Sequence, residues 1–470
     1  MTNRMTDKKE FCGIFGIFDH PNAAETVYLS LYALQHRGEE SCGVAVFDGR
    51  KIRHLTGMGL VPDVLCPEKL KTLKGNSAIG HVRYSTTGSS ILKNAQPFLI
   101  SHNKFSISIA HNGNLTNAVR LRRELERQGA IFQSTMDSEI ILHLLVRSKE
   151  NTIEGRLAEA LSKCDGAYSL LLLTGEGLIG VRDPYGFRPL CLGKKDGSFV
   201  LASETCAFDL IGAEFIREIA PGEMVTISKR GLEPVEPFSP VPPASCVFEF
   251  IYFARPDSRI FGQSVYEVRK RLGMSLAHES PVPGADIVMS IPDSGNYAAL
   301  GYAQKSGLPF EFGMIRNHYI GRTFIQPSQE MREHSVKIKL NPIMGVIKGK
   351  KVVVVEDSIV RGTTTGGRIK AIREAGAKEI HMRISCPPIK FPCFYGIDFP
   401  SRKQLIANEL DLEGIADFIG VDSLEYLSLE GMIEAVKGKA HCGGFCTACF
   451  SGQYPTKVHK SALKNPFEKK

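Results

Sequence analysis

Apolar and polar residues follow two periods along this chain, one typical of strands and one typical of helices. The clearest signal is the run Val352 to Val355, because an uninterrupted β-branched stretch is typical of a central parallel strand buried on both faces. A turn rich in acids, hydroxyls and glycine follows over 356–365, and a helical pattern covers 366–375. This strand–turn–helix unit predicts an open α/β sheet, in which ligands bind at the carboxyl ends of the strands.

A second unit of the same kind lies upstream. A helical pattern over 265–278 precedes a strand at 286–291, the loop Pro292-Asp293-Ser294-Gly295 and a helix at 296–305. Taken alone, this loop is an ordinary turn. Because it lies one strand away from the valine strand, we expect the two loops to bind the same ligand.

The first half of the chain has a different pattern, which predicts a layered αββα sandwich with the strands inside and the helices outside. The predicted helices are 25–36, 115–128 and 136–148, and the predicted strands are 41–47, 76–84, 104–110, 168–173, 178–182 and 200–203. The strand at 104–110 is expected to stop at His111. Pro234 to Pro243 breaks both periods and marks a crossing between domains, after which Cys246 is expected to open a hydrophobic strand.

The turn after the valine strand carries the candidate chemistry. Its backbone N–H groups and hydroxyls can hold phosphate oxygens at a helix N-terminus, and Gly362 lets the backbone approach closely. Glu356 and Asp357 can contact sugar hydroxyls or hold a hard cation through water. An acidic pair alone is more often a solvated turn, but the ordered combination of valines, acids, Ser, Arg, Gly and threonines favours a phosphate site. The hydroxyls are those of Ser358, Thr363, Thr364 and Thr365.

Composition limits the class of protein. A chain of 470 residues, 43% hydrophobic and 23% charged, has room for two or three folded domains. The charge of +8, from 58 basic and 50 acidic residues, fits a substrate with several phosphates as well as it fits nucleic acid. No apolar run approaches the roughly 20 residues that span a bilayer, and the polar start lacks a signal peptide's apolar core. We therefore expect a cytoplasmic protein that binds neither membrane nor nucleic acid.

The 12 cysteines are then not disulfides by default. Cys12 opens the first apolar strand, where a cysteine is more often packing than catalysis. Cys446 and Cys449 form a lone CxxC in a glycine-rich segment, and that spacing is ambiguous among zinc, redox and cluster chemistry.

The sequence EDSIVRGTT, 356–364, resembles the phosphoribosylpyrophosphate (PRPP) fingerprint of type I phosphoribosyltransferases, and the chain resembles the amidophosphoribosyltransferase family in its propeptide-bearing, iron–sulfur-containing branch. Glu356 replaces an aspartate of that fingerprint and keeps its charge on a longer side chain. The other matching motifs are CGIFGI, LQHRGEES, GHVRYSTTG, AHNGNL, MDSE and RDPYGFRPL in the first half and VFEFIYFARPDS, PDSG, GRTFIQP, PCFYGIDFP and EGM in the second.

The resemblance implies an α+β and α/β two-domain protein. A propeptide (1–11) would precede an N-terminal nucleophile amidotransferase domain (12–236), a parallel-sheet phosphoribosyltransferase domain with an iron–sulfur tail (237–455) and a basic C-terminal tail (456–470). The implied reaction transfers ammonia from glutamine to C1 of PRPP and gives 5-phosphoribosylamine, glutamate and pyrophosphate, the first step of de novo purine biosynthesis. Alternatives are another glutamine-dependent ammonia-channelling synthase, which would lack EDSIVRGTT, and a PRPP-sensing regulator, which would not need Cys12.

In the first domain the resemblance implies that Cys12 attacks glutamine once residues 1–11 are removed, with its own α-amine as base. Asn112 and Gly113 would stabilise the oxyanion, Arg83 would bind the substrate carboxylate and Asp137 its ammonium. From the residues alone, Arg83 could equally be a surface cation and Asp137 a helix N-cap.

In the second domain the resemblance implies a PRPP site with Mg²⁺. A basic segment over 321–340 resembles a lid whose cations neutralise the departing pyrophosphate. The implied PRPP-binding residues are Asp293, Gly295, Arg322, Arg332, Glu356, Asp357, Ser358, Arg361, Gly362, Thr363 and Thr364, and the implied magnesium ligands are Ser294, Glu356 and Asp357.

The resemblance also implies a structural 4Fe-4S cluster. Its ligands would be Cys246, Cys393, Cys446 and Cys449, with Cys386 and Cys442 as possible substitutes. A zinc site is the second interpretation. Purine nucleotides as inhibitors and a homotetramer are implied by the family as well.

Overall fold

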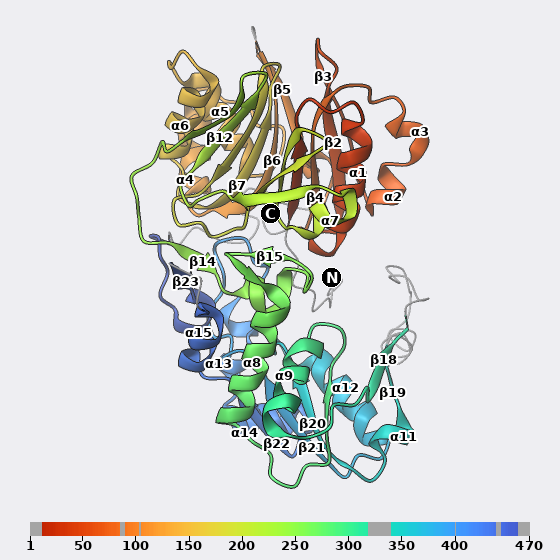
Figure 1. The fold of residues 1–470 in the computed structure, drawn as a ribbon. Helices are drawn as coiled ribbons and strands as arrows, with labels where there is room; N and C mark the ends of the chain where they lie inside the picture. The colour runs from red at the N-terminus through yellow and green to blue at the C-terminus, as the bar shows by residue number, and fades with distance from the viewer. Residues whose placement is uncertain are drawn as a thin grey trace.

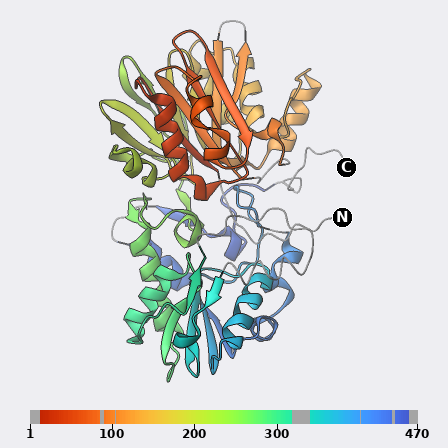
Figure 2. The same ribbon diagram turned by 90° about the vertical axis from the view of Figure 1, so that its right-hand side faces the viewer.

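The computed structural model describes residues 12–84, 90–102, 105–317, 340–399, 401–438 and 443–458. Two domains lie one above the other in Figures 1 and 2. The N-terminal domain runs from strand β1 (Gly13–Ile17) to β13 (Gly231–Val235), and the C-terminal domain begins at β14 (Ala244–Cys246). None of the helices in these described ranges has the length and apolarity needed to cross a membrane.

Two antiparallel sheets stack in the N-terminal domain. One has the order β11-β9-β10-β1-β4-β2-β3 and the other β13-β12-β8-β7-β6-β5. The bounds of the first sheet's strands, besides β1, are β2 (Ser41–Phe47), β3 (Ile52–Met58), β4 (Ser77–Arg83), β9 (Cys191–Lys195), β10 (Ser198–Ala202) and β11 (Glu214–Glu218). Those of the second sheet, besides β13, are β5 (Phe98–His102), β6 (Phe105–Leu115), β7 (Gly166–Leu173), β8 (Gly177–Arg182) and β12 (Met224–Ser228).

Helices cover the outer face of each sheet, as Figure 1 shows. The first sheet is covered by α1 (Ala23–Ala33), α2 (Val61–Val64), α3 (Pro67–Leu70) and α7 (Cys206–Ile211), and the second by α4 (Ala118–Arg127), α5 (Ser138–Arg147) and α6 (Ile153–Ser162). Three apolar layers result, one between the sheets and one under each set of helices. This is the predicted αββα sandwich, and the prediction is confirmed. Short 3-10 turns lie at η1 (Gln35–Arg37) and η2 (Leu92–Asn94).

The strand expected to stop at His111 continues to Leu115. Residues His111 to Leu115 pair antiparallel with β7, although His111, Asn112 and Asn114 are polar. His111 and Asn112 are buried, and hydroxyl groups of Ser138 and Ser203 contact their side chains. The prediction was wrong because alternation of hydrophobic residues ends where the polar site begins, not where the backbone pairing ends.

The C-terminal domain is built on a parallel sheet of order β17-β20-β21-β22. Its central strand β20 carries the four valines, each fully buried. The strands are β17 (Ile287–Ser290), β20 (Lys351–Glu356), β21 (Glu379–Ile384) and β22 (Ser423–Tyr426). Helices α8 (Val265–Glu279) and α9 (Asn296–Ser306) lie on one side of this sheet and α12 (Thr363–Glu374) on the other, as Figure 2 shows. Helix α8 packs against α9 and α15 (Leu429–Lys437), and α12 packs against α14 (Leu412–Ile419).

The hydrophobic strand expected from Cys246 onward is wrong. Strand β14 ends at Cys246, and residues Glu249–Phe253 form the π-helical turn η3. The apolar run is buried all round, so its composition does not distinguish a strand from a helical turn.

Short elements complete the domain. They are the pairs β14–β23 (Gly444–Cys446), β15 (Arg259–Ile260)–β16 (Gln263–Ser264) and β18 (Met314–Arg316)–β19 (Leu340–Pro342), and the helical turns α11 (Met344–Ile347), η4 (Arg402–Gln404), α13 (Ile406–Glu409) and α16 (Ala448–Ser451).

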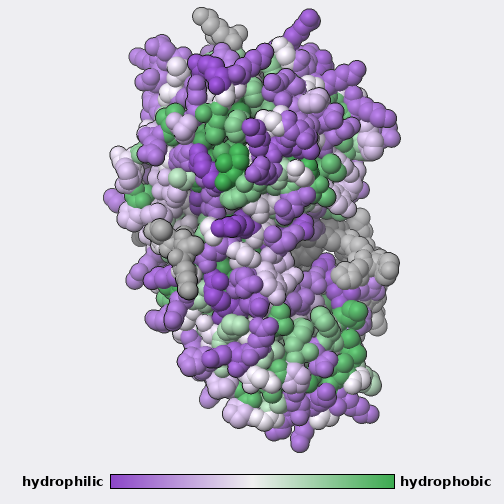
Figure 3. Space-filling model, in the orientation of Figure 1, coloured by the Kyte–Doolittle hydropathy of each residue, from purple (hydrophilic) through white to green (hydrophobic). Residues whose placement is uncertain are grey.

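Hydrophilic residues cover much of the face in Figure 3. Apolar residues also gather at its lower right, over β18, β19 and α11. Phe312, Ile315 and Met344 are all more than half exposed in that region.

Candidate functional site

Cys12 lies directly before β1 and is only 6% exposed. Its Sγ donates to the Tyr84 carbonyl over 3.8 Å. Burial raises the pKa of the Cys12 thiol, the neighbouring Arg83 lowers it, and Asp137 and Glu40 raise it. The structure therefore brings the predicted nucleophile together with the two residues expected to hold glutamine.

Arg83 ends β4 and is fully buried, so its interpretation as a surface cation is wrong. Its Nη1 lies 3.1 Å from Glu40 Oε1. Burial lowers the pKa of Arg83, while Glu40, Cys12 and Asp137 raise it. A guanidinium held in this way presents a fixed fork to a carboxylate.

Asp137 stands at the N-cap position of α5, but its side chain makes no capping hydrogen bond. Instead its Oδ2 accepts the Leu115 N–H over 2.8 Å, which ties α5 to the end of β6. Burial would raise the pKa of Asp137. The neighbouring His111 and the hydrogen bonds that the Asp137 carboxylate accepts keep that pKa below its ordinary value. A buried carboxylate that stays ionised suits recognition of an ammonium group.

Asn112 and Gly113 lie on the polar end of β6. Asn112 Nδ2 donates to Ser203 Oγ over 3.5 Å, and Ser203 Oγ accepts the Ile14 N–H, two residues from Cys12. Among the described residues, the buried Asn112 Oδ1 has no hydrogen-bond partner. A buried amide with unused hydrogen-bonding capacity is typical of a ligand site.

Gly113 requires glycine for two reasons. Its φ is 155°, and a Cβ there would lie 2.0 Å from the Ala167 carbonyl oxygen. The backbone of Gly113 is thus held against β7 in a conformation that a side chain would prevent.

Two histidines in and beside β6, His81 and His111, were missed from the sequence. His111 Nδ1 lies 2.9 Å from Ser138 Oγ, and the His111 carbonyl lies 3.0 Å from His81 Nε2. Burial lowers the pKa of His81 to about 3, so this ring is neutral and joins β4 of one sheet to β6 of the other. These residues stand in the matching motifs AHNGNL, GHVRYSTTG and MDSE. Sequence spacing does not show that they meet, because they lie on different sheets and on a helix.

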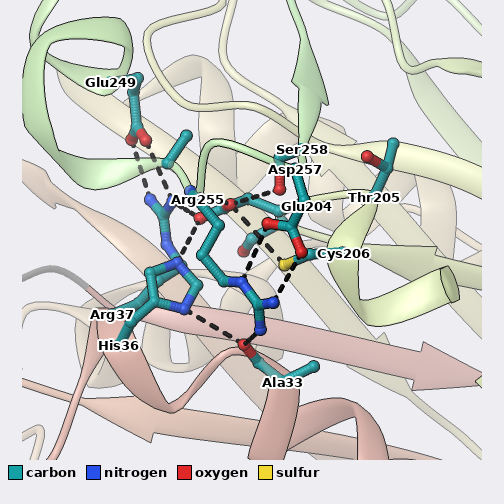
Figure 4. A network of polar contacts seen from close by, with 12 residues as sticks. Ala33, His36, Arg37, Glu204, Thr205, Cys206, Glu249, Arg255, Asp257 and Ser258 are labelled. Carbon is teal, nitrogen blue, oxygen red and sulfur yellow. Dashed lines mark hydrogen bonds and ion pairs between the residues drawn. The ribbon is translucent and has the colours of Figure 1, made fainter. Parts of the chain in front are cut away.

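Arg37 was missed as well. Its side chain is buried, and its Nε donates to the Cys12 carbonyl over 2.9 Å. Figure 4 shows it among the buried carboxylates Glu204 and Glu249. The available signal was the position of Arg37 within the matching segment LQHRGEES. The sequence does not show its burial, which for an arginine requires paired partners.

The second candidate site lies at the carboxyl edge of the parallel sheet. Strands β17 and β20 pair directly, with Ser290 beside Val355. Ser294 Oγ donates to Asp357 Oδ1 over 2.6 Å, and Ser358 Oγ donates to the other carboxylate oxygen. The two loops predicted to share a ligand therefore meet.

Glu356 faces α12. Thr365 Oγ1 donates to it over 3.2 Å, and Arg368 Nη1 forms an ion pair with its other oxygen. Arg368 was not anticipated from the sequence. Both acids are nearly buried, at 4% for Glu356 and 5% for Asp357, which excludes a simple solvated turn.

Gly362 precedes α12 with a φ of 77°, and the helix begins at Thr363. Thr363 is exposed at this N-terminus, and Arg361 and Thr364 are half-buried beside it. Gly295 packs where a Cβ would lie 2.6 Å from the Val355 carbonyl. Asp293 is half exposed and paired with Arg316 over 2.6 Å. Arg322 and Arg332 lie outside the described residues.

The four cysteines expected to bind a cluster gather near the domain junction. Cys246 of β14 is in register with Cys446 of the parallel strand β23, and Cys393 and Cys449 belong to the adjoining core. All four are free thiols. Burial raises the pKa of each and that of Cys246 to about 11.

Arg188 is the cation beside these thiols and lowers the pKa of Cys246 and Cys393. Cys386 is also buried near Cys449, and Cys442 lies outside the described residues. In the described ranges, no three His, Cys, Asp or Glu side chains stand in an arrangement that could hold a metal ion. The donor set, three buried thiols and the half-buried Cys393 beside Arg188, nevertheless fits a thiolate-bound cluster chemically.

Comparison with known proteins matches both halves. Residues 81–209 match the family model of a glutamine amidotransferase domain. The chain is 50% identical over 462 residues to chloroplastic amidophosphoribosyltransferase 1 of Arabidopsis thaliana, covering 97% of this chain and 80% of that protein. It is 46% identical to the amidophosphoribosyltransferase of Bacillus subtilis, covering 97% and 96%.

A solved structure of glutamine PRPP amidotransferase from B. subtilis, complexed with ADP and GMP, superimposes with a TM-score of 0.91 at 45% identity. The match covers 97% of this chain and 100% of that one.

Proposed function

This chain belongs to the amidophosphoribosyltransferase family, and from that premise we propose how its residues divide the family's reaction. The enzyme transfers ammonia from glutamine to C1 of PRPP, giving 5-phosphoribosylamine, glutamate and pyrophosphate, the first step of de novo purine biosynthesis. The two alternatives do not fit, because the relatives match nearly the whole chain and not one half of it.

In the N-terminal domain, removal of residues 1–11 would free the α-amine of Cys12. That amine takes the thiol proton as Sγ attacks the side-chain amide carbon of glutamine, and returns it to the leaving nitrogen. The tetrahedral oxyanion accepts hydrogen bonds from the Asn112 side chain and the Gly113 N–H. Ammonia departs, and water then cleaves the thioester to give glutamate.

Arg83 and Asp137 would select glutamine by its backbone groups. The Arg83 guanidinium binds the α-carboxylate and the Asp137 carboxylate binds the α-ammonium. Their support is that both are buried, ionised and next to Cys12. This single cluster carries the proposal for the first site.

In the C-terminal domain, the turn after β20 would hold PRPP. Ser358, Gly362, Thr363 and Thr364 would bind the 5-phosphate at the N-terminus of α12. The rest of the proposed PRPP set is Asp293, Gly295, Arg322, Arg332, Glu356, Asp357 and Arg361.

Ser294, Glu356 and Asp357 would hold Mg²⁺, which neutralises charge on the departing pyrophosphate. The support is the hydrogen bond between Ser294 and Asp357, which joins the two loops at the expected place. The attacking ammonia would replace pyrophosphate at C1 of the ribose.

Cys246, Cys393, Cys446 and Cys449 would hold a 4Fe-4S cluster that ties the β23 segment to the junction, with zinc as the second candidate. Anaerobically purified protein should be brown and contain about four irons per chain. Chelation should bleach it and expose 443–458 to protease. A colourless protein with one zinc per chain would contradict the cluster.

Further proposals concern the whole chain. We place the amidotransferase domain at 12–236, the phosphoribosyltransferase domain at 237–455 and a basic tail at 456–470. Purine nucleotides would act as inhibitors, which the ADP and GMP complex of the B. subtilis protein supports. A homotetramer and a cytoplasmic location complete the proposal.

The experiment is a Cys12→Ala variant assayed with two nitrogen donors. Phosphoribosylamine formation from glutamine should disappear, while formation from ammonium at alkaline pH should remain, because the second site does not use the thiol. Survival of the glutamine-dependent rate would contradict the role of Cys12. Loss of both rates would show that Cys12 is structural.

A further inference from the structure

A buried charge network lies at the domain junction (Figure 4), and Arg37 within it contacts the carbonyl of the candidate nucleophile. Besides its bond to the Cys12 carbonyl, the Arg37 guanidinium donates to Glu249 over 3.0 and 2.8 Å and to Glu204. All three side chains are fully buried. A two-bond arginine–carboxylate pair fixes the orientation of the guanidinium plane, so Glu249 determines where Arg37 holds Cys12.

The partners of Arg37 come from different domains. Glu204 follows β10 in the N-terminal domain, whereas Glu249 opens η3 in the C-terminal domain. Glu204 also accepts hydrogen bonds from the Ser258 hydroxyl and the Arg255 N–H, over 2.7 and 2.8 Å. The junction is therefore a shared polar network.

Glu249 also pairs with a second buried arginine, Arg188. Arg188 Nη1 donates to Glu249 over 3.2 Å, and Arg188 Nη2 donates to the Tyr395 carbonyl over 2.6 Å. The next residue, Gly396, packs on β6, where an added Cβ would lie 3.2 Å from the Gly113 carbonyl carbon. The Glu249 carboxylate thus supports Cys12 through Arg37. Through Arg188 it also supports the segment of Tyr395 and Gly396 that packs on β6.

Helix α8 fixes the turn that carries Glu249. Arg269 of α8 is buried and donates to the Phe250 and Ala254 carbonyls over 2.7 and 2.8 Å. The backbone of this turn is therefore held by a buried side chain of α8.

We propose that Glu249 is a positioning residue of the glutamine site, supplied by the C-terminal domain. It acts through Arg37 on Cys12 and through Arg188 on the segment of Tyr395 and Gly396 that packs against β6. The proposal rests on the assigned role of Cys12 in glutamine hydrolysis. It makes the first half-reaction dependent on a docked second domain.

The test is Glu249→Gln in the full chain, assayed with glutamine and with ammonium. The amide keeps the shape but loses the charge that pairs with two arginines. We expect the glutamine-dependent kcat to fall by about 10- to 100-fold, since small displacements of reacting groups have effects of that size. The KM for PRPP and the ammonium-dependent rate should stay within about twofold of wild type.

The matched control is Thr205→Val. Thr205 Oγ1 accepts the Arg259 N–H over 2.8 Å across the same junction, without contact to Arg37. The control removes one interdomain hydrogen bond of ordinary kind, and both of its rates should stay near wild type. An equal loss in the two variants would mean that general weakening of the junction, and not Glu249, causes the effect.

A double-mutant cycle tests whether Glu249 acts through Arg37. In an Arg37→Gln background, Glu249→Gln should cause much less further loss of glutamine-dependent kcat than in wild type, because the two residues act as a unit. Full additivity would overturn the proposal. So would a proportional loss of glutamine- and ammonium-dependent rates in the single variant, which would make Glu249 a purely structural residue.

Failure of this inference is distinguishable from failure of the assigned function. If Cys12→Ala retains glutamine-dependent activity, the role of Cys12 is wrong. If Cys12→Ala abolishes it but Glu249→Gln does not reduce it, only the positioning role is wrong.

Discussion

Two residues in the polar part of β6, Asn112 and Gly113, form the proposed oxyanion site. They lie within β6, after its apolar part, and the backbone stays paired with β7 there. Gly113 permits this because its backbone conformation excludes a Cβ. The residue is therefore a sensitive place to perturb glutamine chemistry alone.

Gly113→Ala should lower the glutamine-dependent rate by about 10²-fold or more, which is the typical loss of one oxyanion donor. The added methyl must push the backbone away from Ala167. The ammonium-dependent rate, measured on the same preparation, should stay within about twofold of wild type. A variant with unchanged glutamine turnover would mean that the Gly113 N–H does not face the reacting carbonyl.

Asp357 should be essential to the second site. Asp357→Asn removes the charge that Ser294 and Ser358 contact, and we expect the rates with glutamine and with ammonium to fall together by about 10²-fold or more. Asp286→Asn is the control, because Asp286 accepts the Lys351 N–H at the opposite end of β20. If both substitutions had the same effect, the loss would come from the strand and not from the ligand site.

At the scale of elements, strand periodicity located most of the fold. The range Ser41–Phe47 was predicted to the residue, and the valine run is the buried centre of the parallel sheet. Errors arose where burial is complete on all sides or where a site interrupts the pattern, as in η3 and the end of β6. There the local sequence does not carry the information, because distant partners satisfy the backbone.

The histidine between the two stacked sheets predicts a pH response. The folded-state pKa of His81, about 3, lies below the ordinary value of 6.5, so the unfolded chain binds more protons between these values. Its contribution to stability is therefore present above pH 6.5 and is lost as pH falls toward 3. At pH 5 the loss amounts to about 2 kcal/mol.

His81→Gln should weaken the dependence of stability on pH in this range, because glutamine can still donate to the His111 carbonyl but does not titrate. The measurement is the melting temperature at pH 7.5 and pH 5 for both proteins. Equal shifts in the variant and in wild type would assign the acid response to other groups.

At the scale of the whole molecule, the sequence motifs predicted both half-sites but not how they are joined. Cys12, Arg83 and Asp137 were recognisable because they stand in motifs of the family, and the structure brings them together. Arg37 and Glu249 are 212 positions apart, and neither stands in a periodic pattern. Only the folded junction shows that they form one unit, since the pairing depends on how two domains dock.

The central claim is that one chain moves the amide nitrogen of glutamine to C1 of PRPP. The most direct measurement supplies amide-¹⁵N glutamine, PRPP and Mg²⁺ to the mature enzyme and follows glutamate, pyrophosphate and the label in trapped phosphoribosylamine. The account predicts ¹⁵N in the amine, with glutamate and pyrophosphate formed in equal amounts. Glutamine hydrolysis without pyrophosphate release, or an unlabelled amine, would contradict it.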